Sequence, residues 1–443
     1  MGEGICLYSP SPAGCTYSPN ARGRNYDEQM KRSHLLFRSL VFLTLAALPF
    51  AAEAQTRRTR RTPTRPAAAG AKRPPANPPS TAVAATGINI TAADMALVVE
   101  SLNFQPETRT HLSTNTEERR EFARDIRRVL TAAEEAKAAG YLTRPELKLQ
   151  TELARAFVIA QAYFKQRQAS GVTNPEQAIT TGEIDALFKD PATGPQFEAF
   201  LQDYSKNSQL RGAPVPEATR QNLHEQYGRI MVGMRKGVAA GLDRDRKTQL
   251  TILLQHARLL ASAYAKEMRS RFQPTAAEID AFIAAHPEYD TKPERAKIEA
   301  ILARVRAGED FAKLADEFTE DPSGKGKGGD LGWFGRGTMV KPFEDAAFAL
   351  KPGEVSSVVE SPFGFHIVKL DERRTQGTGE EIHARHILIA YKLNARAPGW
   401  QVLPRDQASA ALEEEKRNRA LDEAATRRQI QVAEDYVVGT TPP

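Results

Sequence analysis

The sequence predicts an α+β protein in which a long helical region precedes a smaller mixed domain. Between about residues 91 and 283, no strand alternation is sustained and apolar residues recur at helical spacing. Between 293 and 390, short helical segments are followed by a glycine-rich loop, a Pro-Gly turn and two stretches of strand character. The 443 residues are enough for two or three domains, each with its own core.

The first 54 residues read as an unused upstream start followed by an export signal. Residues 30–54 pass from a basic start through an apolar stretch to an Ala-x-Ala site, which is the order of a secretory signal peptide cleaved after Ala54. The apolar stretch is too short to span a membrane. Residues 1–29 are polar, lack a pattern and precede a second methionine. We therefore expect a periplasmic or secreted protein.

Both cysteines, Cys6 and Cys15, lie in the segment that precedes this export signal. No residue downstream of them can form a disulfide, a redox pair or a thiolate metal site. A cysteine mechanism is therefore excluded for the folded body.

A basic segment without acidic residues follows at 55–86. Its seven positive charges, between Arg57 and Arg73, exceed the net charge of +6 of the whole chain. With so little apolar side chain, the segment cannot offset its ordering entropy, and we expect a disordered tether. It is either a solvated spacer or a weak electrostatic contact of residues 55–73 with an anionic envelope surface. Because the remaining body is close to neutral, nucleic acid is not expected as a partner.

Residues 87–286 contain one helical pattern twice. The segment that begins Ala138-Ala-Gly recurs at Ala239-Ala-Gly, an offset of 101 residues. In each copy a helix stops at glycine, a long helix follows, and a threonine with Glu183 or Glu278 three residues later opens a short helix. A period near 100 residues is too long for a solenoid, so the pattern indicates duplication of one subdomain.

The segment from Gly308 to Leu370 carries motifs at regular spacing. They are Gly-Glu-Asp-Phe, Thr-Glu-Asp-Pro-Ser, Gly-Gly-Asp-Leu-Gly-Trp-Phe, Lys-Pro-Phe-Glu-Asp-Ala-Ala-Phe and Ser-Pro-Phe-Gly-Phe-His-Ile-Val-Lys-Leu. The pattern predicts helices at about 293–307 and 310–318, a third helix from about Pro342, and a strand at 365–370. This nearly unbroken run resembles the parvulin family of peptidyl-prolyl cis-trans isomerases. The resemblance implies an antiparallel sheet with surrounding helices.

The parvulin pattern also has a His-Ile-Leu strand before its first helix, and this sequence lacks that strand there. The eight residues from His286 include two prolines and no apolar run. A matching stretch stands instead at 382–390, after the last strand. The simplest account is a circular permutation within a domain at 287–391, with 372–380 as the connecting loop. The alternative is that 383–391 begins a second, degenerate copy of the domain.

Two histidines fall inside the matched motifs. The period of two in a strand places His386 on one face with Ala384, and His383 on the opposite face. These two side chains point apart, which disfavours a His-x-x-His metal site. By resemblance, His366 and His386 are the paired catalytic histidines, and Ser361 is the hydroxyl that holds the nearer ring.

By the same resemblance, Asp321 stands where parvulins carry Cys or Asp, next to the substrate carbonyl. Leu331, Met339 and Phe343 would form the apolar slot that grips the proline ring, although core packing alone would also explain their apolar character. Because Asp321 replaces a cysteine, we expect it to act electrostatically, tuned by the two histidines. Isomerisation of an X-Pro bond needs no nucleophile, metal or cofactor.

The helical region and the tail at 392–443 resemble parts of SurA-like periplasmic foldases. Residues 404–430 read as a charged amphipathic helix, and in that family a C-terminal helix and strand return to the helical lobe. The resemblance implies an exported isomerase and chaperone whose partners are unfolded or proline-containing polypeptides. The alternative is a holdase chaperone whose parvulin domain is inactive and serves as structure or as a peptide-binding module. The sequence does not indicate an oligomeric state.

Overall fold

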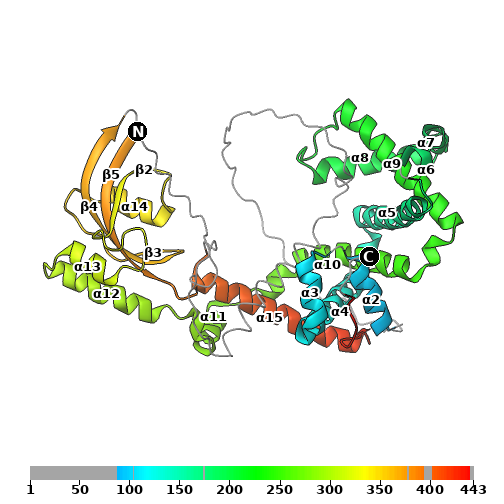
Figure 1. The fold of residues 1–443 in the computed structure, drawn as a ribbon. Helices are drawn as coiled ribbons and strands as arrows, with labels where there is room; N and C mark the ends of the chain where they lie inside the picture. Colours follow the sequence, from blue (N-terminus) through cyan, green and yellow to red (C-terminus); the bar gives the residue numbers. More distant parts are fainter. Residues whose placement is uncertain (1–86, 103, 173–174, 377–378, 394–401, 440–443) are drawn as a thin grey trace. The chain divides into compact units, whose positions relative to one another are not determined.

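The described part of the chain is mostly helical, with one four-stranded antiparallel sheet and a short parallel strand pair (Figure 1). This agrees with the α+β class expected from the sequence. The computed structural model describes residues 87–102, 104–172, 175–376, 379–393 and 402–439. These residues lie in one contact-defined unit, 83–443. The expected signal peptide at 30–54 and tether at 55–86 lie outside the described residues.

Helices fill the chain between residues 92 and 285. They are α2 (Ala92–Ser101), α3 (Pro106–Thr114), α4 (Thr116–Ala138), α5 (Pro145–Ala169), α6 (Pro175–Ala178), α7 (Thr181–Phe188), α8 (Thr193–Asn207), α9 (Glu217–Ala239), α10 (Arg246–Phe272) and α11 (Ala276–Ala285), with the short 3-10 helices η1 (Tyr141–Thr143), η2 (Leu242–Arg244) and η3 (Pro287–Tyr289).

Two stretches of this helical region have the same order of elements. Helices α4 and α5 are joined through η1, and α9 and α10 through η2, with a left-handed glycine, Gly140 or Gly241, before each 3-10 helix. Capping boxes at Thr180 and Thr275 open α7 and α11, because each threonine hydroxyl accepts from the N3 amide while the N3 glutamate accepts from the cap amide. Helix α5 packs on α9, and α10 packs on both α4 and α5.

The C-terminal segment packs on the first helices of this region. It consists of α15 (Pro404–Arg427) and β6 (Gln431–Val432), and β6 pairs in parallel with β1 (Asn89–Ile90). Asp422 of α15 is 3.2 Å from the guanidinium of Arg127 and 3.0 Å from that of Arg128, both on α4. The Tyr436 hydroxyl donates to the Arg119 carbonyl at 3.2 Å. Backbone pairing thus joins β1 to β6, and ion pairs join α4 to α15.

The sheet belongs to residues 292–390. Its elements are α12 (Lys292–Arg306), α13 (Phe311–Phe318), β2 (Asp330–Gly335), α14 (Lys341–Ala349), β3 (Val359–Ser361), β4 (Gly364–Gln376) and β5 (Gly379–Ala390). The strand order is β2-β5-β4-β3, and every neighbouring pair is antiparallel. Strand β5, which is last in the sequence of the domain, therefore lies inside the sheet between β2 and β4.

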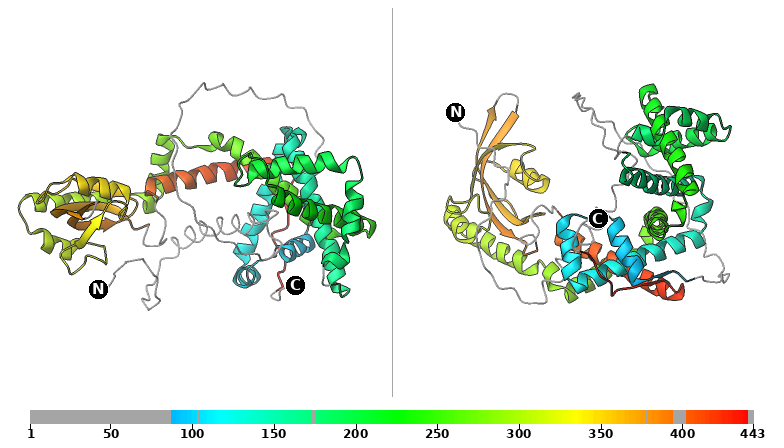
Figure 2. Two further views of the ribbon diagram at one scale, coloured as in Figure 1. Left: turned by 90° about the horizontal axis from the view of Figure 1, so that it is seen from above. Right: turned by 45° about the vertical axis from the view of Figure 1, so that its right-hand side comes forward.

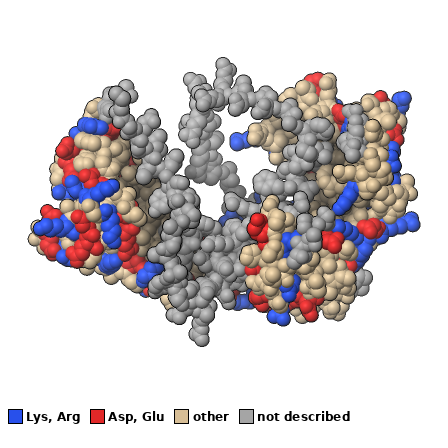
Figure 3. All heavy atoms as spheres, viewed as in Figure 1, with Lys and Arg blue, Asp and Glu red and all other residues tan. Residues whose placement is uncertain are grey.

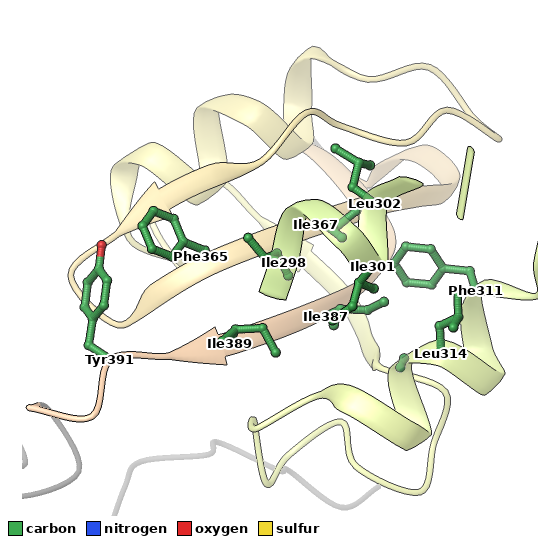
Figure 4. Close-up of a cluster of buried hydrophobic side chains, with 11 residues drawn as sticks. Ile298, Ile301, Leu302, Phe311, Leu314, Phe365, Ile367, Ile387, Ile389 and Tyr391 are labelled. Atoms are coloured by element: carbon green, nitrogen blue, oxygen red, sulfur yellow. The ribbon is translucent and has the colours of Figure 1, made fainter. Parts of the chain in front are cut away.

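Helices cover both faces of this sheet. Helix α14 lies on one face and α12 and α13 lie on the other (Figure 2). Under α12 and α13, the buried side chains of β4 and β5 are Phe365, Ile367, Ile387 and Ile389 (Figure 4). Under α14 they include Val368, Leu370, Ile382 and Ala384. Each strand thus sends alternate side chains to two separate apolar layers.

The expected loop at 372–380 is wrong, because β4 and β5 form one long hairpin. Pairing continues to Gln376 opposite Gly379, so β5 begins at residue 379 and not at 382. The polar sequence suggested a loop, but cross-strand ion pairs stabilise the ladder. Arg373 pairs with Glu380, and Arg374 pairs with Glu381 at 2.7 Å.

The visible surface carries both signs of charge, interspersed over the helices and the sheet (Figure 3). Within the described part of the chain, no helix combines the length and the apolar character needed to cross a membrane.

Candidate active site

The register of the β4–β5 hairpin brings His366 and His386 together. His366 lies opposite Leu388, and His386 lies opposite Val368, so the two histidines are diagonal neighbours on one face. Their Nδ1 atoms are 3.3 Å apart, and each residue is 4% exposed. The strand alternation expected for His386 and Ala384 is the alternation found, since Ala384 is buried on this same face.

The segment that follows α13 positions Asp321. Strand β2 pairs with β5 only as far as Arg385, and this segment contacts β5 further along, at Leu388. The Glu320 amide donates to the Leu388 carbonyl at 2.8 Å, and the Leu388 amide donates to Thr319 Oγ1 at 3.2 Å. These bonds fix the backbone one residue before Asp321. As a result, Asp321 Oδ2 lies 2.7 Å from His386 Nε2.

A close backbone approach at Gly329 supports the same strand. The His386 amide donates to the Gly329 carbonyl at 2.9 Å, and Gly329 has a φ of +74°. A Cβ at this position would lie 2.2 Å from the His386 carbonyl oxygen. Only glycine meets both conditions, so the glycine-rich loop is needed for the placement of His386.

The four polar residues expected at the site form one continuous hydrogen-bond chain. Ser361 Oγ is 2.7 Å from His366 Nε2, and the chain continues through the two Nδ1 atoms to His386 and Asp321. An ionised carboxylate only accepts, so His386 Nε2 donates to Asp321. With both rings neutral, His366 Nδ1–H then donates to His386 Nδ1, and the Ser361 hydroxyl donates to His366 Nε2. One tautomer assignment therefore satisfies every atom of the chain.

The electrostatics of the chain keep one negative charge at its outer end. Burial raises the pKa of Asp321, but hydrogen bonds from His386 and from the Ser323 amide outweigh it and hold that pKa at about 2. Burial, and to a smaller extent the neighbouring His386 ring, lowers the pKa of His366 to about 3. Asp321 is thus ionised and His366 neutral near pH 7, and the Asp321 side chain is still 20% exposed.

The expected slot residues lie beside the histidine pair. The Phe343 ring, on α14, stands edge-on to both imidazoles, with ring centroids 5.2 Å from His366 and 5.5 Å from His386. Leu331 and Met339 are half-buried and pack against the cluster that contains Phe343. All seven residues expected at the site therefore belong to one face of the sheet and the elements that border it.

His383 lies on the other face of β5 and takes no part in this chain. Its Nε2 is 2.9 Å from Asp330 Oδ1, and its ring stacks on Trp333 with centroids 5.5 Å apart. The described ranges contain no group of three or more His, Cys, Asp or Glu side chains arranged to hold a metal ion.

Two contributors to the site were not identified from the sequence. Thr319 is fully buried and its hydroxyl holds the Leu388 amide, which ties the Asp321 segment to β5. The Phe363 amide donates to Ser361 Oγ at 3.1 Å, so the turn before β4 fixes the serine. No periodic signal marks Thr319, because it follows the end of a helix. Its place between Phe318 and Glu320 in the matched motif could have suggested a structural role.

This arrangement suits a reaction that needs an apolar slot and a fixed charge, because the chain ends in a carboxylate and holds both histidines in place. A helix-flanked antiparallel sheet with a histidine pair on one face is the arrangement that the resemblance to parvulins implied. Comparison with known families agrees: residues 268–374 match the family described as the PPIC-type PPIASE domain. The match ends before β5, so His386 lies outside the matched residues.

Similar proteins are foldases and chaperones. The chain is 48% identical over 82 residues to the foldase protein PrsA of Geobacillus kaustophilus, covering 18% of this chain and 29% of that protein. It is 31% identical over 220 residues to the chaperone SurA of Thiobacillus denitrificans, covering 43% of this chain and 49% of that protein. A crystal structure of PrsA from Bacillus anthracis aligns over 64% of this chain and 98% of its own, with 17% identity and a TM-score of 0.15. The chain thus covers less than half of the length of the first two relatives.

Proposed function

We propose that this protein is an exported peptidyl-prolyl cis-trans isomerase and chaperone that assists the folding of envelope or secreted proteins. The observation that carries the proposal is the chain from Ser361 through both histidines to Asp321, set against Phe343 in a domain of the PPIC type. Its clients would be unfolded, proline-containing polypeptides, the class of substrate implied by the foldase and chaperone relatives.

Rotation about an X-Pro bond is slow because amide resonance raises the barrier to ~18–20 kcal/mol. The planar imide places negative charge on its carbonyl oxygen, and twisting removes that charge. An ionised Asp321 beside the carbonyl therefore disfavours the planar form, and so reduces the free energy needed to reach the twisted one. An apolar slot without water would hold the proline ring, formed by Phe343, Leu331 and Met339. Solvent screens the charge of Asp321 least in such a slot.

In this proposal the histidines act through Asp321. His366 and His386 keep the carboxylate oriented and supply the hydrogen bond that lowers its pKa. Ser361 fixes the ring of His366 from the other end of the chain. None of the three needs to contact the reacting bond, so they are positioning residues, and Asp321 is the group that faces the substrate.

We further propose that the domain, at 287–391, is a circular permutation of the parvulin order. The position of β5 supports this. Although β5 is the last strand of the domain in sequence, it pairs with β2 and β4 in the middle of the sheet. The rival account, a second degenerate copy beginning at 383, would leave that central position without a strand. The matching orders of α4–α5 and α9–α10 likewise support duplication within a helical lobe at 87–286.

The location and the roles of the terminal segments are part of the same proposal. A signal peptide at 30–54, cleaved after Ala54, would export the protein to the periplasm or the medium. The basic segment at 55–86 would be a tether, with residues 55–73 able to contact an anionic envelope surface. Residues 392–443 would complete the helical lobe, as the packing of α15 on α4 supports.

A protease-coupled assay of a proline tetrapeptide with the full chain tests the isomerase activity. We expect catalysis over the spontaneous rate, and a loss of roughly tenfold or more for Asp321→Ala, the scale of one charge-assisted interaction. The unfolding transition should be retained in this variant. A full chain that is folded but gives no acceleration would instead support the alternative, a holdase whose parvulin domain binds peptide without isomerising it.

A further inference from the structure

Strand β5 loses β2 as a partner after Arg385, and two side chains take over the bonds to its amides. The Leu388 amide donates to Thr319 Oγ1 at 3.2 Å. The Ala390 amide donates to Glu320 Oε2 at 2.9 Å. In a continuous ladder the carbonyls of a neighbouring strand would accept from these amides. Two consecutive side-chain oxygens, on the residues directly before Asp321, thus replace the missing strand.

Glu320 is bound to both β5 and α12. Besides accepting from the Ala390 amide, it donates its own amide to the Leu388 carbonyl at 2.8 Å. Its second carboxylate oxygen, Oε1, lies 2.7 Å from Lys297 Nζ on α12. The two side chains of this ion pair are 40% and 45% exposed, so the pair itself contributes little to stability. The contacts of Glu320 therefore fix a geometry more than they stabilise the fold.

That geometry decides where the Asp321 carboxylate stands. Asp321 Oδ2 is 2.7 Å from His386 Nε2, so the bond joins the segment after α13 to β5. The Ser323 amide donates to Asp321 Oδ1 at 2.9 Å, and the Lys325 amide donates to the Asp321 carbonyl at 3.2 Å. Both of these donors belong to the loop of Asp321 itself, so they fix its turn and not its distance from β5. Glu320 bonds to β5 directly and can set that distance.

We propose that Glu320 is a positioning residue for the isomerase reaction and acts through Asp321. By holding the Ala390 amide, its carboxylate sets the spacing between the Asp321 segment and β5, and so aligns Asp321 Oδ2 with His386 Nε2. Lys297 fixes the other carboxylate oxygen, so α12, which covers the opposite face of the sheet, contributes to the site. This inference rests on the proposed function in one respect, that Asp321 faces the substrate.

Two substitutions at this position in the full chain test the proposal. Glu320→Ala removes the acceptor, and kcat with the proline tetrapeptide should fall roughly two- to tenfold, the scale of one hydrogen bond. Glu320→Gln keeps an oxygen that can accept from the Ala390 amide and should retain most of the turnover. If the glutamine variant loses as much as the alanine variant, the charge and not the hydrogen bond matters, and the proposal fails.

Proton NMR of the full chain gives a readout that a purely structural role would not change. The imidazole proton that His386 donates to Asp321 is identified by its loss in His386→Gln. In Glu320→Ala this signal should move upfield or broaden by exchange with water, because the hydrogen bond lengthens. An unchanged signal would overturn the proposal. Glu317→Ala is the matched control, because Glu317 is also exposed and lies 3.7 Å from Arg304 of α12, but has no hydrogen bond to β5 among the described residues. Equal effects of both alanine substitutions would assign the loss to general electrostatics and refute the positioning role.

A double-mutant cycle tests whether Glu320 acts through Asp321. In a chain that already carries Asp321→Ala, the change Glu320→Ala should cause no further loss of turnover, because no carboxylate remains to be positioned. A further loss of the same size would overturn the proposal. If the unaltered chain does not isomerise the peptide at all, the proposed function fails, but the response of the His386 proton to Glu320→Ala still decides the positioning role. The two proposals can therefore fail independently.

Discussion

The two faces of the sheet differ in polarity, although the same strands, β4 and β5, build both. The face under α12 and α13 is apolar along its buried length, from Phe365 to Ile389. The face under α14 combines an apolar layer with a buried polar chain that ends at the partly exposed Asp321. Alternation in the strands separates the side chains that stabilise the sheet from those that carry the proposed chemistry. Neighbouring residues should therefore give different phenotypes when changed.

The largest expected effect is on stability, from the apolar face. The Ile387 side chain, on β5, is fully buried under α12 and α13. Ile387→Ala should therefore lower the free energy of unfolding by about 2–5 kcal/mol. Urea unfolding followed by tryptophan fluorescence measures this, since Trp333 lies on the neighbouring strand. Turnover per folded molecule should change little. If the folded fraction also loses most of its turnover, the two faces are not separable.

The next effect is on turnover, from the polar face. His386→Gln breaks the hydrogen-bond chain, and isomerase turnover should fall by roughly tenfold, the scale of one lost charge-assisted bond. His383→Gln is the matched control, because His383 is on the same strand but faces the other way, toward Asp330 and Trp333. Equal losses from both substitutions would contradict the assignment of faces.

The polar face should also make stability depend on pH. The pKa of His366 is about 3 in the folded protein against 6.5 in a model peptide, so between these values the unfolded state binds more protons. Stability then rises with pH through this window, by at most ~1.4 kcal/mol per pH unit for one proton. Asp321 adds to the acid loss below about 3.8, because its folded pKa is about 2.

Denaturant unfolding at several pH values measures this slope. His366→Gln should flatten the part between about pH 3 and 6.5 and leave the acid limb due to Asp321. An unchanged slope in this variant would mean that other groups carry the dependence.

The smallest expected effect comes from the inner end of the chain. Ser361→Ala removes the partner of His366 Nε2 and of the Phe363 amide, and should destabilise the protein by about 1 kcal/mol. Ser361→Thr keeps the hydroxyl and should restore most of that loss. Thermal unfolding of the two variants side by side distinguishes them; no rescue by threonine would show that packing, and not the hydroxyl, matters at this fully buried position.

The sequence predicted the helices around the sheet well because their ends carry local signals. The helix expected at 310–318 is α13, Phe311–Phe318, and Asp310 caps it by accepting from the Lys313 amide at 2.9 Å. The strand alternation of His386 was also readable, since it depends only on a period of two.

The length of the hairpin was not predictable from the same kind of signal. Residues 371–376 are polar or charged, which is typical of a loop, and they form a strand because their partners at 379–381 complement them. Cross-strand pairing of this kind is a property of two segments together. The placement of Asp321 has the same origin, because Thr319 holds a backbone amide that lies 69 residues further along the chain.

The hairpin also has a consequence for the order in which the domain can fold as the chain emerges. His366 and His386 are 20 residues apart on two strands that pair as far as Gln376 and Gly379, so their contact is local and closes at little entropic cost. Strand β2, however, has only β5 as its partner in the sheet, and β5 is made about 50 residues later. When the chain emerges from its N-terminus, as it does in export across a membrane, α12, α13 and β2 therefore appear before the strand that can organise them. We expect the domain to form in one late step, after residue 390 has emerged.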